Sequence, residues 1–321
     1  MRFQVACISA VLIVSSIGFA QEPNNPMNVR SRISIYDLAT KSVQVVYTAE
    51  KLWEAPNWSP DGKYLMANSG GAIYRIAVDG KSAPEKVALD SSYACNNDHG
   101  ISPDGKRLAF SASHGNPKGS QVFVAGVDGS KPELVTEAAP SYFHGWSPDG
   151  KWLAFVGERN GHFNIFRVSP EGGEEERLTS AAAYDDGPDY SPDGKWIYIN
   201  SDRSGGWDIW RFPADGAGRG DTKAQSVTSD EMEDWFPHPS PDGKWIVFLS
   251  FPRGTEGHNV KTKIQLRMIA MPGDERPSEK PRFHVLTEFF GGQGTINVNS
   301  WSPDSKRFAF VSYEVLKQAD Q

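Results

Sequence analysis

The chain has 321 residues, with 33 lysines and arginines against 40 aspartates and glutamates, so its formal net charge is −7. A chain of this length can bury a large core. Its acidic balance argues against nucleic acid or an anionic membrane as the main partner.

The first twenty residues have the pattern of a secretory signal peptide. Arg2 gives a basic start, an apolar stretch runs from Val5 to Phe19, and Gly18-Phe19-Ala20 offers the small residues that a signal peptidase requires. The stretch is short for a membrane span, so we expect cleavage rather than anchoring. The mature chain would then keep one cysteine, Cys95, and no internal disulfide. A periplasmic or secreted protein with no membrane span after cleavage is predicted.

A repeated Ser-Pro-Asp-Gly tetrapeptide organises the rest of the chain. Proline fixes φ at its second position, aspartate bonds the local backbone and glycine permits a positive φ, so each copy predicts a turn. The serines are 43, 45, 44, 49 and 62 residues apart, close to the period of four-stranded propeller blades. The copies begin at Ser59, Ser102, Ser147, Ser191, Ser240 and Ser302, and the last one reads Ser-Pro-Asp-Ser.

The strands around these turns predict how the ring closes. Each turn is followed by a strand rich in β-branched and aromatic residues, as in Lys151-Trp152-Leu153-Ala154-Phe155. The sixth copy lacks its last two strands, and residues 33–38 and 43–47 match them. We therefore predict an all-β fold, a six-bladed β-propeller with four-stranded antiparallel blades whose last blade is closed by N-terminal strands. The expected boundaries are a linker over 21–31, the propeller over 32–315 and a C-terminal tail over 316–321.

On these turns and the Leu-Ala-Phe strands that follow them, the chain resembles the TolB-like, WD40-like (PD40) β-propellers over residues 33–313. The resemblance implies the fold. It leaves function open, because propellers host binding modules and enzymes alike.

Polar residues precede each turn, where the innermost strand of the blade is expected. Three of the seven histidines, His99, His144 and His238, fall within three residues of a turn. Connections in a meander alternate between the two ends of a blade, and the loops opposite the Ser-Pro-Asp-Gly turns are the variable ones. Because variable loops on a rigid frame usually carry function, we place the site at the channel mouth opposite these turns.

A metal site or a substrate site fits these residues, and polar groups that only hydrate a water-filled channel would give the same pattern. Imidazole and carboxylate groups are ligands for a divalent metal such as Mn, Zn or Ca. The metal candidates are His99, His144, His238 and Asp189, and the catalytic candidates are His144, His238 and Asp189. The ligand-binding candidates are Glu54, Asn57, Asn97, Asp98, Tyr142, Asp186, Asp234, Trp235, Arg253, His258 and Asn299.

The fifth blade contains the longest insertion between its second and third strands, residues 251–263, which includes Arg253 and His258. Its glycines and its length fit a lid over the mouth, and they fit a surface insertion equally well.

Two functions follow from this reading. The first is a non-catalytic binding module for a protein or glycan at that mouth, because no Gly-x-Ser-x-Gly elbow, Walker motif or zincin helix is present. The alternative is a carbohydrate-active enzyme, a metal-assisted lyase or a hydrolase on acidic oligosaccharides that uses the His and Asp residues. A looser similarity to oligogalacturonate lyases, propellers with a histidine-bound metal, favours a lyase over a hydrolase. The expected partner is a protein or an oligosaccharide, and the expected state is a monomer.

Overall fold

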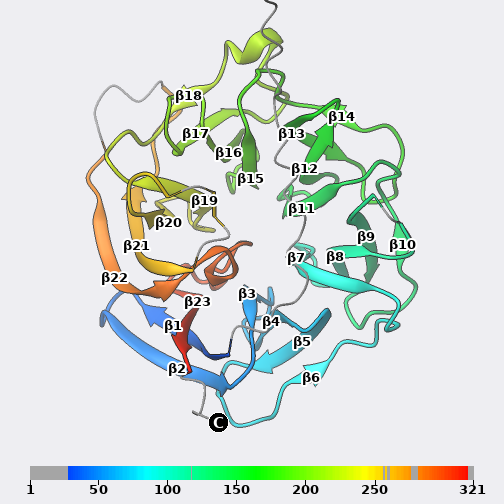
Figure 1. Ribbon diagram of the computed structural model, residues 1–321, viewed down its shortest axis with the longest axis vertical. Coiled ribbons are helices and arrows are strands. Elements are labelled where there is room, and N and C mark those ends of the chain that lie inside the picture. The colour runs from blue at the N-terminus through cyan, green and yellow to red at the C-terminus, as the bar shows by residue number, and fades with distance from the viewer. Residues whose placement is uncertain (1–27, 117, 256, 259–260, 276–280, 317–321) are drawn as a thin grey trace, which may run out of the picture.

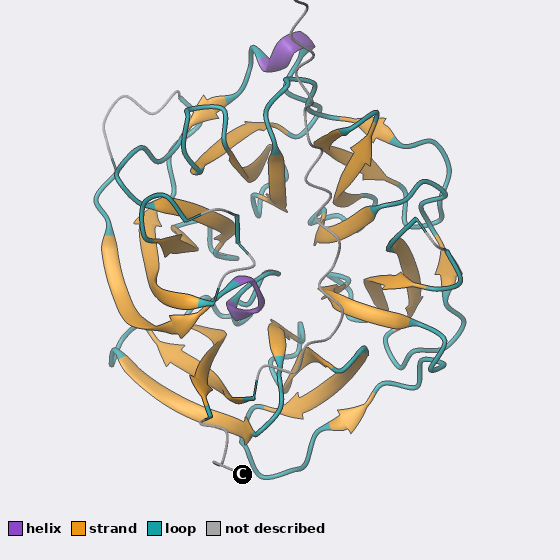
Figure 2. Cartoon of the chain, viewed as in Figure 1, coloured by secondary structure: helices purple, strands orange, loops and turns teal. Residues whose placement is uncertain are grey.

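The computed structural model describes residues 28–316 except 117, 256, 259–260 and 276–280. Six antiparallel sheets surround one axis (Figure 1), and strands dominate the described chain (Figure 2). Its two helical segments are the short 3-10 helices η1 (Arg219–Asp221) and η2 (Gln293–Thr295). No helix in these residues is long and apolar enough to cross a membrane. The predicted six-bladed propeller is confirmed, whereas the predicted signal peptide, 1–20, lies outside the described residues.

Blades 1 to 5 each contain four strands, which run outward from the axis in chain order. Blade 1 contains β3 (Glu54–Trp58), β4 (Tyr64–Ser69), β5 (Ala72–Ala77) and β6 (Glu85–Lys86). Blade 2 contains β7 (Ala94–Ile101), β8 (Arg107–Ser113), β9 (Gln121–Gly126) and β10 (Glu133–Leu134). Blade 3 contains β11 (Ser141–Trp146), β12 (Leu153–Arg159), β13 (His162–Val168) and β14 (Glu176–Arg177). Blade 4 contains β15 (Asp185–Tyr190), β16 (Trp196–Ser201), β17 (Asp208–Pro213) and β18 (Gln225–Ser226). Blade 5 contains β19 (Glu233–Pro239), β20 (Trp245–Phe251), β21 (Thr262–Ala270) and β22 (His284–Gly291).

Blade 6 joins the two ends of the described chain. β23 (Arg307–Val315) pairs with β1 (Val29–Asp37), which pairs with β2 (Ser42–Ala49). The predicted closure by N-terminal strands is therefore confirmed, and β1 begins inside the segment expected to be a linker. Residues 296–301 take the place of the innermost strand, but only the bridge between Trp301 and Phe308 ties them to the sheet.

The Ser-Pro-Asp-Gly turns form an interlocked ring. In each turn the serine hydroxyl donates to the aspartate Oδ1 over 2.6–2.7 Å, and the glycines have φ between 70° and 75°. Successive turns touch, because a Cβ on Gly105 would lie 3.9 Å from Pro60 and one on Gly243 would lie 3.5 Å from Pro192. The repeat therefore draws six prolines together around one end of the axis.

Every innermost strand of blades 1 to 5 breaks register at the same level. The breaks lie between Glu54 and Asn57, Cys95 and His99, Phe143 and Gly145, Asp186 and Asp189, and Trp235 and His238. A bulge of this kind re-aims the side chains beside it. The bulges thus lie in the stretches where the polar residues were predicted.

The apolar core lies between blades, away from the axis. In one cluster Ala109 and Val122 of blade 2 pack with Phe143 and Phe155 of blade 3. Since blade-to-blade contacts bury the apolar side chains, the axial ends of the innermost strands are available for polar residues.

Candidate functional site in the axial channel

A cavity of about 350 Å³ lies on the axis at the end where the Ser-Pro-Asp-Gly turns meet. Its wall includes the proline of every turn: Pro60, Pro103, Pro148, Pro192, Pro241 and Pro303. The residue just before each turn also contributes: Trp58, Ile101, Trp146, Tyr190, Pro239 and Trp301. The cavity is thus on the turn side of the ring, whereas the sequence pointed to the opposite mouth.

Five predicted site residues add polar groups to this lining, one from each of five blades. They are Asn57, His99, His144, Asp189 and Asn299. Their convergence from separate blades is what the closed ring was expected to produce. An apolar wall with a few placed polar groups is typical of a binding cavity.

His238 supports the lining from behind. Its Nδ1 lies 3.0 Å from Asp189 Oδ2 and its Nε2 lies 2.6 Å from the carbonyl oxygen of Ile296. Asn299 donates from Nδ2 to the same Asp189 oxygen over 2.8 Å. Both contacts of the His238 ring are to acceptors, so both are hydrogen bonds only when both ring nitrogens carry a proton. His238 and Asp189, which were both predicted as metal and catalytic candidates, are therefore in direct contact.

His144 connects the cavity to the carboxylates behind it. Its Nδ1 lies 3.3 Å from the carbonyl oxygen of Asn297, and its Nε2 lies 3.3 Å from Asp186 Oδ1. Burial alone would lower the pKa of His144, but the hydrogen bond to Asp186 and the charges of Asp98 and Asp186 outweigh it and raise this pKa. In the same contact the pKa of Asp186 is lowered, although burial opposes the shift.

Asp98 is the second buried carboxylate of this layer, and it bonds the Asn297 side chain through Nδ2. The same amide lies 3.5 Å from Asn97 Oδ1. Burial raises the pKa of Asp98 to about 6, against the lowering effect of His144. Its charge is therefore only partly compensated by the described residues.

His99 is fully buried, and neither ring nitrogen makes a hydrogen bond of good geometry. Burial lowers its pKa to about 4, so the imidazole is neutral at pH 7. Because the His99 ring is shielded from solvent, we assign it to the packing of the cavity wall and not to proton transfer.

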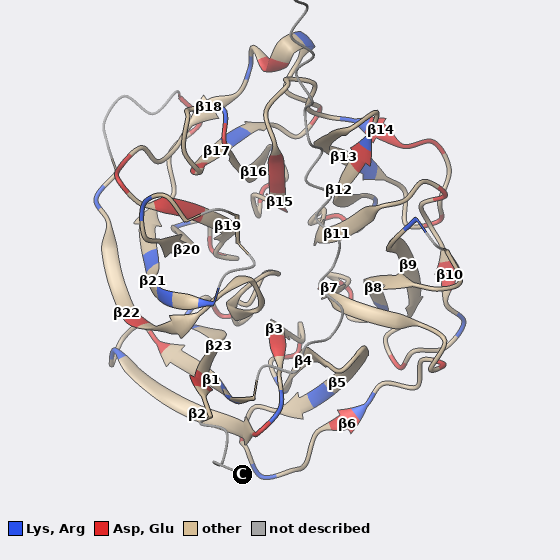
Figure 3. Cartoon of the chain, in the orientation of Figure 1, with Lys and Arg blue, Asp and Glu red and all other residues tan. Residues whose placement is uncertain are grey.

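Two further candidates lie toward the mouth opposite the turns. Glu54 is partly buried beside Gly294, where a Cβ would lie 2.5 Å from its side chain, and burial raises its pKa. Burial, with the charges of Asp98 and Asp186, raises the pKa of Tyr142 to about 12. Figure 3 shows acidic residues near the axis on β3, β15 and β19.

The insertion of blade 5 packs onto aromatic rings where it is described. The His258 ring centre lies 4.5 Å from that of Trp235, and His258 Nδ1 lies 3.8 Å from Asp186 Oδ2. Trp235 is buried and contacts Trp207, with ring centres 3.8 Å apart and the rings tilted by 32°. Arg253 is exposed. Residues 256, 259 and 260 of the predicted lid lie outside the described residues.

Asp234 faces its own blade rather than the channel. Its Oδ1 accepts hydrogen bonds from Ser250 over 2.7 Å and from Arg267 over 2.5 Å, while its Oδ2 has no hydrogen-bond partner. Burial raises the pKa of Asp234 to about 7, although the Arg267 charge lowers it. The structure therefore assigns this carboxylate to the packing of blade 5.

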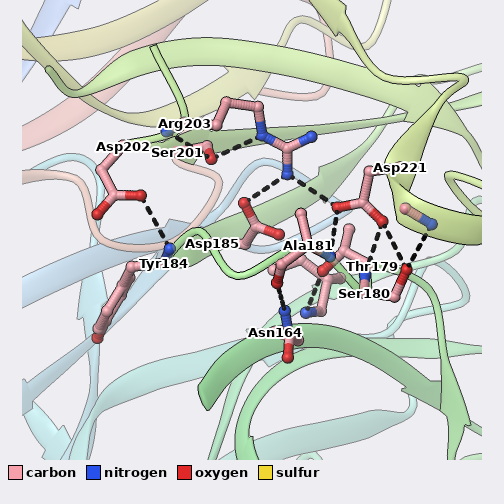
Figure 4. A network of polar contacts seen from close by, with 12 residues as sticks. Asn164, Thr179, Ser180, Ala181, Tyr184, Asp185, Ser201, Asp202, Arg203 and Asp221 are labelled. Carbon is pink, nitrogen blue, oxygen red and sulfur yellow. Dashed lines mark hydrogen bonds and ion pairs between the residues drawn. The ribbon is translucent and has the colours of Figure 1, made fainter. Parts of the chain in front are cut away.

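Asp185 and Asp186 show how neighbouring residues of a strand face opposite ways. Asp186 contacts His144 in the channel, whereas Asp185 accepts a hydrogen bond from Arg203 Nη2 over 2.7 Å. Figure 4 shows Arg203 joining Asp185 to Asp221 of η1. This network anchors the start of β15 and leaves Asp186 directed at the channel.

No group of three or more His, Cys, Asp or Glu side chains in the described parts of the chain is arranged to hold a metal ion. Of the four predicted metal candidates, His238 pairs with Asp189, and His144 pairs with Asp186 instead of with the other three. These two histidines therefore each contact one carboxylate.

Sequence reasoning missed the aromatic residues of the cavity wall. Trp58, Trp146, Tyr190 and Trp301 each stand directly before a Ser-Pro-Asp turn, and this repeated position was the available signal. Arg107 and Arg307 lie over the rings of Trp146 and Trp58, with 5.1 and 5.2 Å from the guanidinium carbon to the ring centre. These contacts fix the orientation of the two indoles.

Fold and site together define a six-bladed propeller with an axial cavity at its turn face. Residues 138–287 match PD40, the TolB beta propeller domain. The uncharacterized protein Atu1656 of Agrobacterium fabrum is 43% identical over 286 residues, which cover 89% of this chain and 93% of that protein. The chain belongs to the TolB-like β-propeller family.

Solved structures agree with this assignment. A solved structure from Agrobacterium tumefaciens, described as a TolB candidate, is 42% identical to this chain. Its TM-score is 0.83, and the match covers 90% of this chain and 99% of that one. TolB from Acinetobacter baumannii is 21% identical, with a TM-score of 0.55 over 80% of this chain and 67% of that one, a likeness that shows the fold alone.

Proposed function

We propose that this protein is a non-catalytic binding propeller that holds part of a protein or glycan ligand in the axial cavity. The observation that carries the proposal is the lining, which combines seven prolines and five aromatic residues with polar side chains from five blades. The polar groups bond to one another, as Asp189 does to His238 and Asn299. A site held in this way is preorganised, which reduces the entropy that binding costs.

The histidine contacts favour binding over the lyase alternative. A general base needs a ring nitrogen that can reach the substrate proton. Both nitrogens of His238 and both of His144 already contact protein acceptors, and those of His99 are shielded. We therefore place the ligand in the turn-side cavity and assign these histidines to shape and support.

A bulky residue at the rim tests the proposal. Pro148 is exposed and lines the cavity, so Pro148→Trp narrows the entrance, whereas Leu134→Trp places the same ring on the outer edge of blade 2, where Leu134 is 47% exposed. The proteins are applied to arrays of peptides and oligosaccharides. Ligands of the wild type should be kept by Leu134→Trp and lost by Pro148→Trp. Unchanged binding by Pro148→Trp would contradict the cavity as the site.

Turnover provides the test against the enzyme alternative. Incubation of the wild type with uronic-acid oligosaccharides should yield no unsaturated product by absorbance. Product formation that disappears in His144→Gln would overturn the non-catalytic proposal.

Export to the periplasm or outside the cell, and a monomeric state, are part of the same proposal. Export rests on the basic start and apolar stretch of the first twenty residues. Cell fractionation of the full chain and of a chain lacking these residues checks export, and light scattering of the purified protein checks the monomer.

A further inference from the structure

The channel end away from the turns contains two buried carboxylates, those of Asp98 and Asp186. Asp186 Oδ1 accepts a hydrogen bond from the Gly187 backbone N–H and contacts His144 Nε2. Asp186 Oδ2 lies 3.8 Å from His258 Nδ1, which is too far for a hydrogen bond. Asp98 receives the side-chain amide of Asn297. A group that enters this space must therefore bring donors.

Asn297 supplies an independent sign of a missing ligand. The residue is fully buried, and its Oδ1 has no hydrogen-bond partner, although its Nδ2 donates to Asp98. This unpaired oxygen belongs to the same planar amide group whose Nδ2 contacts the Asp98 carboxylate. A buried polar atom without a partner costs free energy, which a donor at this point would recover.

The charges point the same way. Asp98 and Asp186 are 2% and 5% exposed, and His144 Nε2 lies 3.3 Å from Asp186, while its charge lowers the pKa of Asp98. His258 Nδ1 lies 3.8 Å from Asp186, but burial lowers the pKa of His258, so that ring is neutral at pH 7. One imidazolium between two buried carboxylates leaves a negative excess. A single positive charge would complete the balance.

Aromatic rings border the carboxylates on one side. Phe163, Tyr184 and Trp207 are each partly buried and follow one another in ring contact, with centres 4.8 and 5.3 Å apart. The Trp207 ring also contacts that of Trp235, which contacts the ring of His258, and His258 Nδ1 lies 3.8 Å from Asp186 Oδ2. Burial and then the charge of Asp186 raise the pKa of Tyr184, and burial with the charges of Asp98 and Asp186 raises that of Tyr142. Aromatic faces beside carboxylates favour an organic cation.

We propose that this end of the channel binds one ammonium or guanidinium group of the kind carried by lysine and arginine side chains. Asp98, Asp186 and Asn297 Oδ1 accept its hydrogen bonds, and the rings of Tyr142 and Tyr184 pack along its alkyl stem. The site adjoins the turn-side cavity through His144, which lines that cavity and contacts Asp186, but it uses other residues. It stands whether or not that cavity holds a ligand.

An NMR titration of the full protein tests the site. The probes are the peptide acetyl-Gly-Gly-Lys-Gly-Gly-amide, a twin with norleucine for lysine, and n-butylammonium. We expect the lysine peptide to bind at least about tenfold more tightly than the norleucine twin, because the two differ only in the charged, hydrogen-bonding group. If n-butylammonium binds as tightly as the lysine peptide, a free amine is sufficient for binding. If only the peptide binds, the ammonium group must be carried on a peptide chain.

Matched variants locate the binding. Asp98→Asn removes one charge and keeps the shape of the side chain. It should weaken the binding of the lysine peptide by about tenfold to a hundredfold. Asp215→Asn removes a charge from an exposed turn, since the Asp215 side chain is 74% exposed, and it should change nothing. Equal binding of the lysine and norleucine peptides, or no loss in a folded Asp98→Asn, overturns the proposal.

A measurement on the wild type covers the case in which Asp98→Asn fails to fold. Nuclear Overhauser effects between the lysine ε-methylene protons of the bound peptide and the Tyr142 ring are expected. Contacts confined to the turn side of the ring would refute the site.

Discussion

The backbone N–H of Asp242 donates to Ser305 Oγ over 2.9 Å, which joins the turn of blade 5 to that of blade 6. Ser305 stands where the other five turns have glycine, and its φ of 57° is in the left-handed region. The hydroxyl thus offsets part of the strain that a non-glycine residue incurs at this position.

Substitutions at Ser305 should separate these two effects. Ser305→Ala keeps the strained φ and loses the hydrogen bond, so the free energy of unfolding should fall by about 1 kcal/mol. Ser305→Gly loses the same bond but relieves strain of about 1 kcal/mol, and it should unfold near the wild type. Urea denaturation measures both. A glycine variant as unstable as the alanine variant would show that φ costs nothing here.

Removing His238 should reveal a support rather than a catalyst. His238→Ala removes the partner of the Ile296 carbonyl, and Asp189 keeps only its hydrogen bond from Asn299. We therefore expect the free energy of unfolding to fall by about 3 kcal/mol. The exposed His162 offers a control, because His162→Ala should stay within about 0.5 kcal/mol of the wild type. Denaturant unfolding of the two variants checks this, and equal effects would contradict the assigned role.

The contact between His144 and Asp186 should make stability depend on pH. The raised pKa of His144 stabilises the fold fully below the ordinary value of 6.5, and this contribution disappears as pH rises through the folded pKa. The lowered pKa of Asp186 contributes above 3.8 and is lost as pH falls. The deficit of His144→Gln should therefore be largest between pH 3.8 and 6.5 and shrink on either side. A deficit that grows from pH 7 to 9 would exclude an imidazolium in this contact.

Asp234 should show the opposite trend from an ordinary paired carboxylate. Because burial raises its pKa from 3.8 to about 7, its contribution is fully present below pH 3.8 and is lost as pH rises through 7. Relative to Asp234→Asn, the wild type should lose stability between pH 4 and 7 and change little above. Unfolding midpoints across this range measure it, and a wild type that gains stability over the interval would mean that the ion pair with Arg267 dominates.

The fold was predictable because its signals are local and repeated. Each Ser-Pro-Asp-Gly turn specifies its own conformation, and their spacing counts the blades. The shortfall of strands after the turn at Ser302 also showed that residues near Ile33 and Val43 had to complete the ring. These inferences need no side-chain geometry.

The site was predictable only in part. The position of His99, His144 and His238 before the turns predicted that they lie on innermost strands, and the structure places them on β7, β11 and β19. The direction of Asp234 did not follow from its position, because it depends on Ser250 and Arg267 of two other strands and on a bulge with a positive φ at Phe236. The turn-side cavity was missed because regular turns suggested an inert face, although their regularity is what gathers six prolines around one opening.

The pairing of β1 with β23 has a consequence for biosynthesis. Arg30 and Glu314, which form an ion pair at 3.2 Å, are 284 residues apart in the chain. During translation β1 and β2 therefore leave the ribosome before the other strands of the propeller, and their partner strand β23 follows only after the other blades. Until then both offer unpaired edges that other chains can join. We expect the nascent chain to need protection by chaperones until β23 emerges, and truncation before Arg307 to yield aggregates rather than a five-bladed ring.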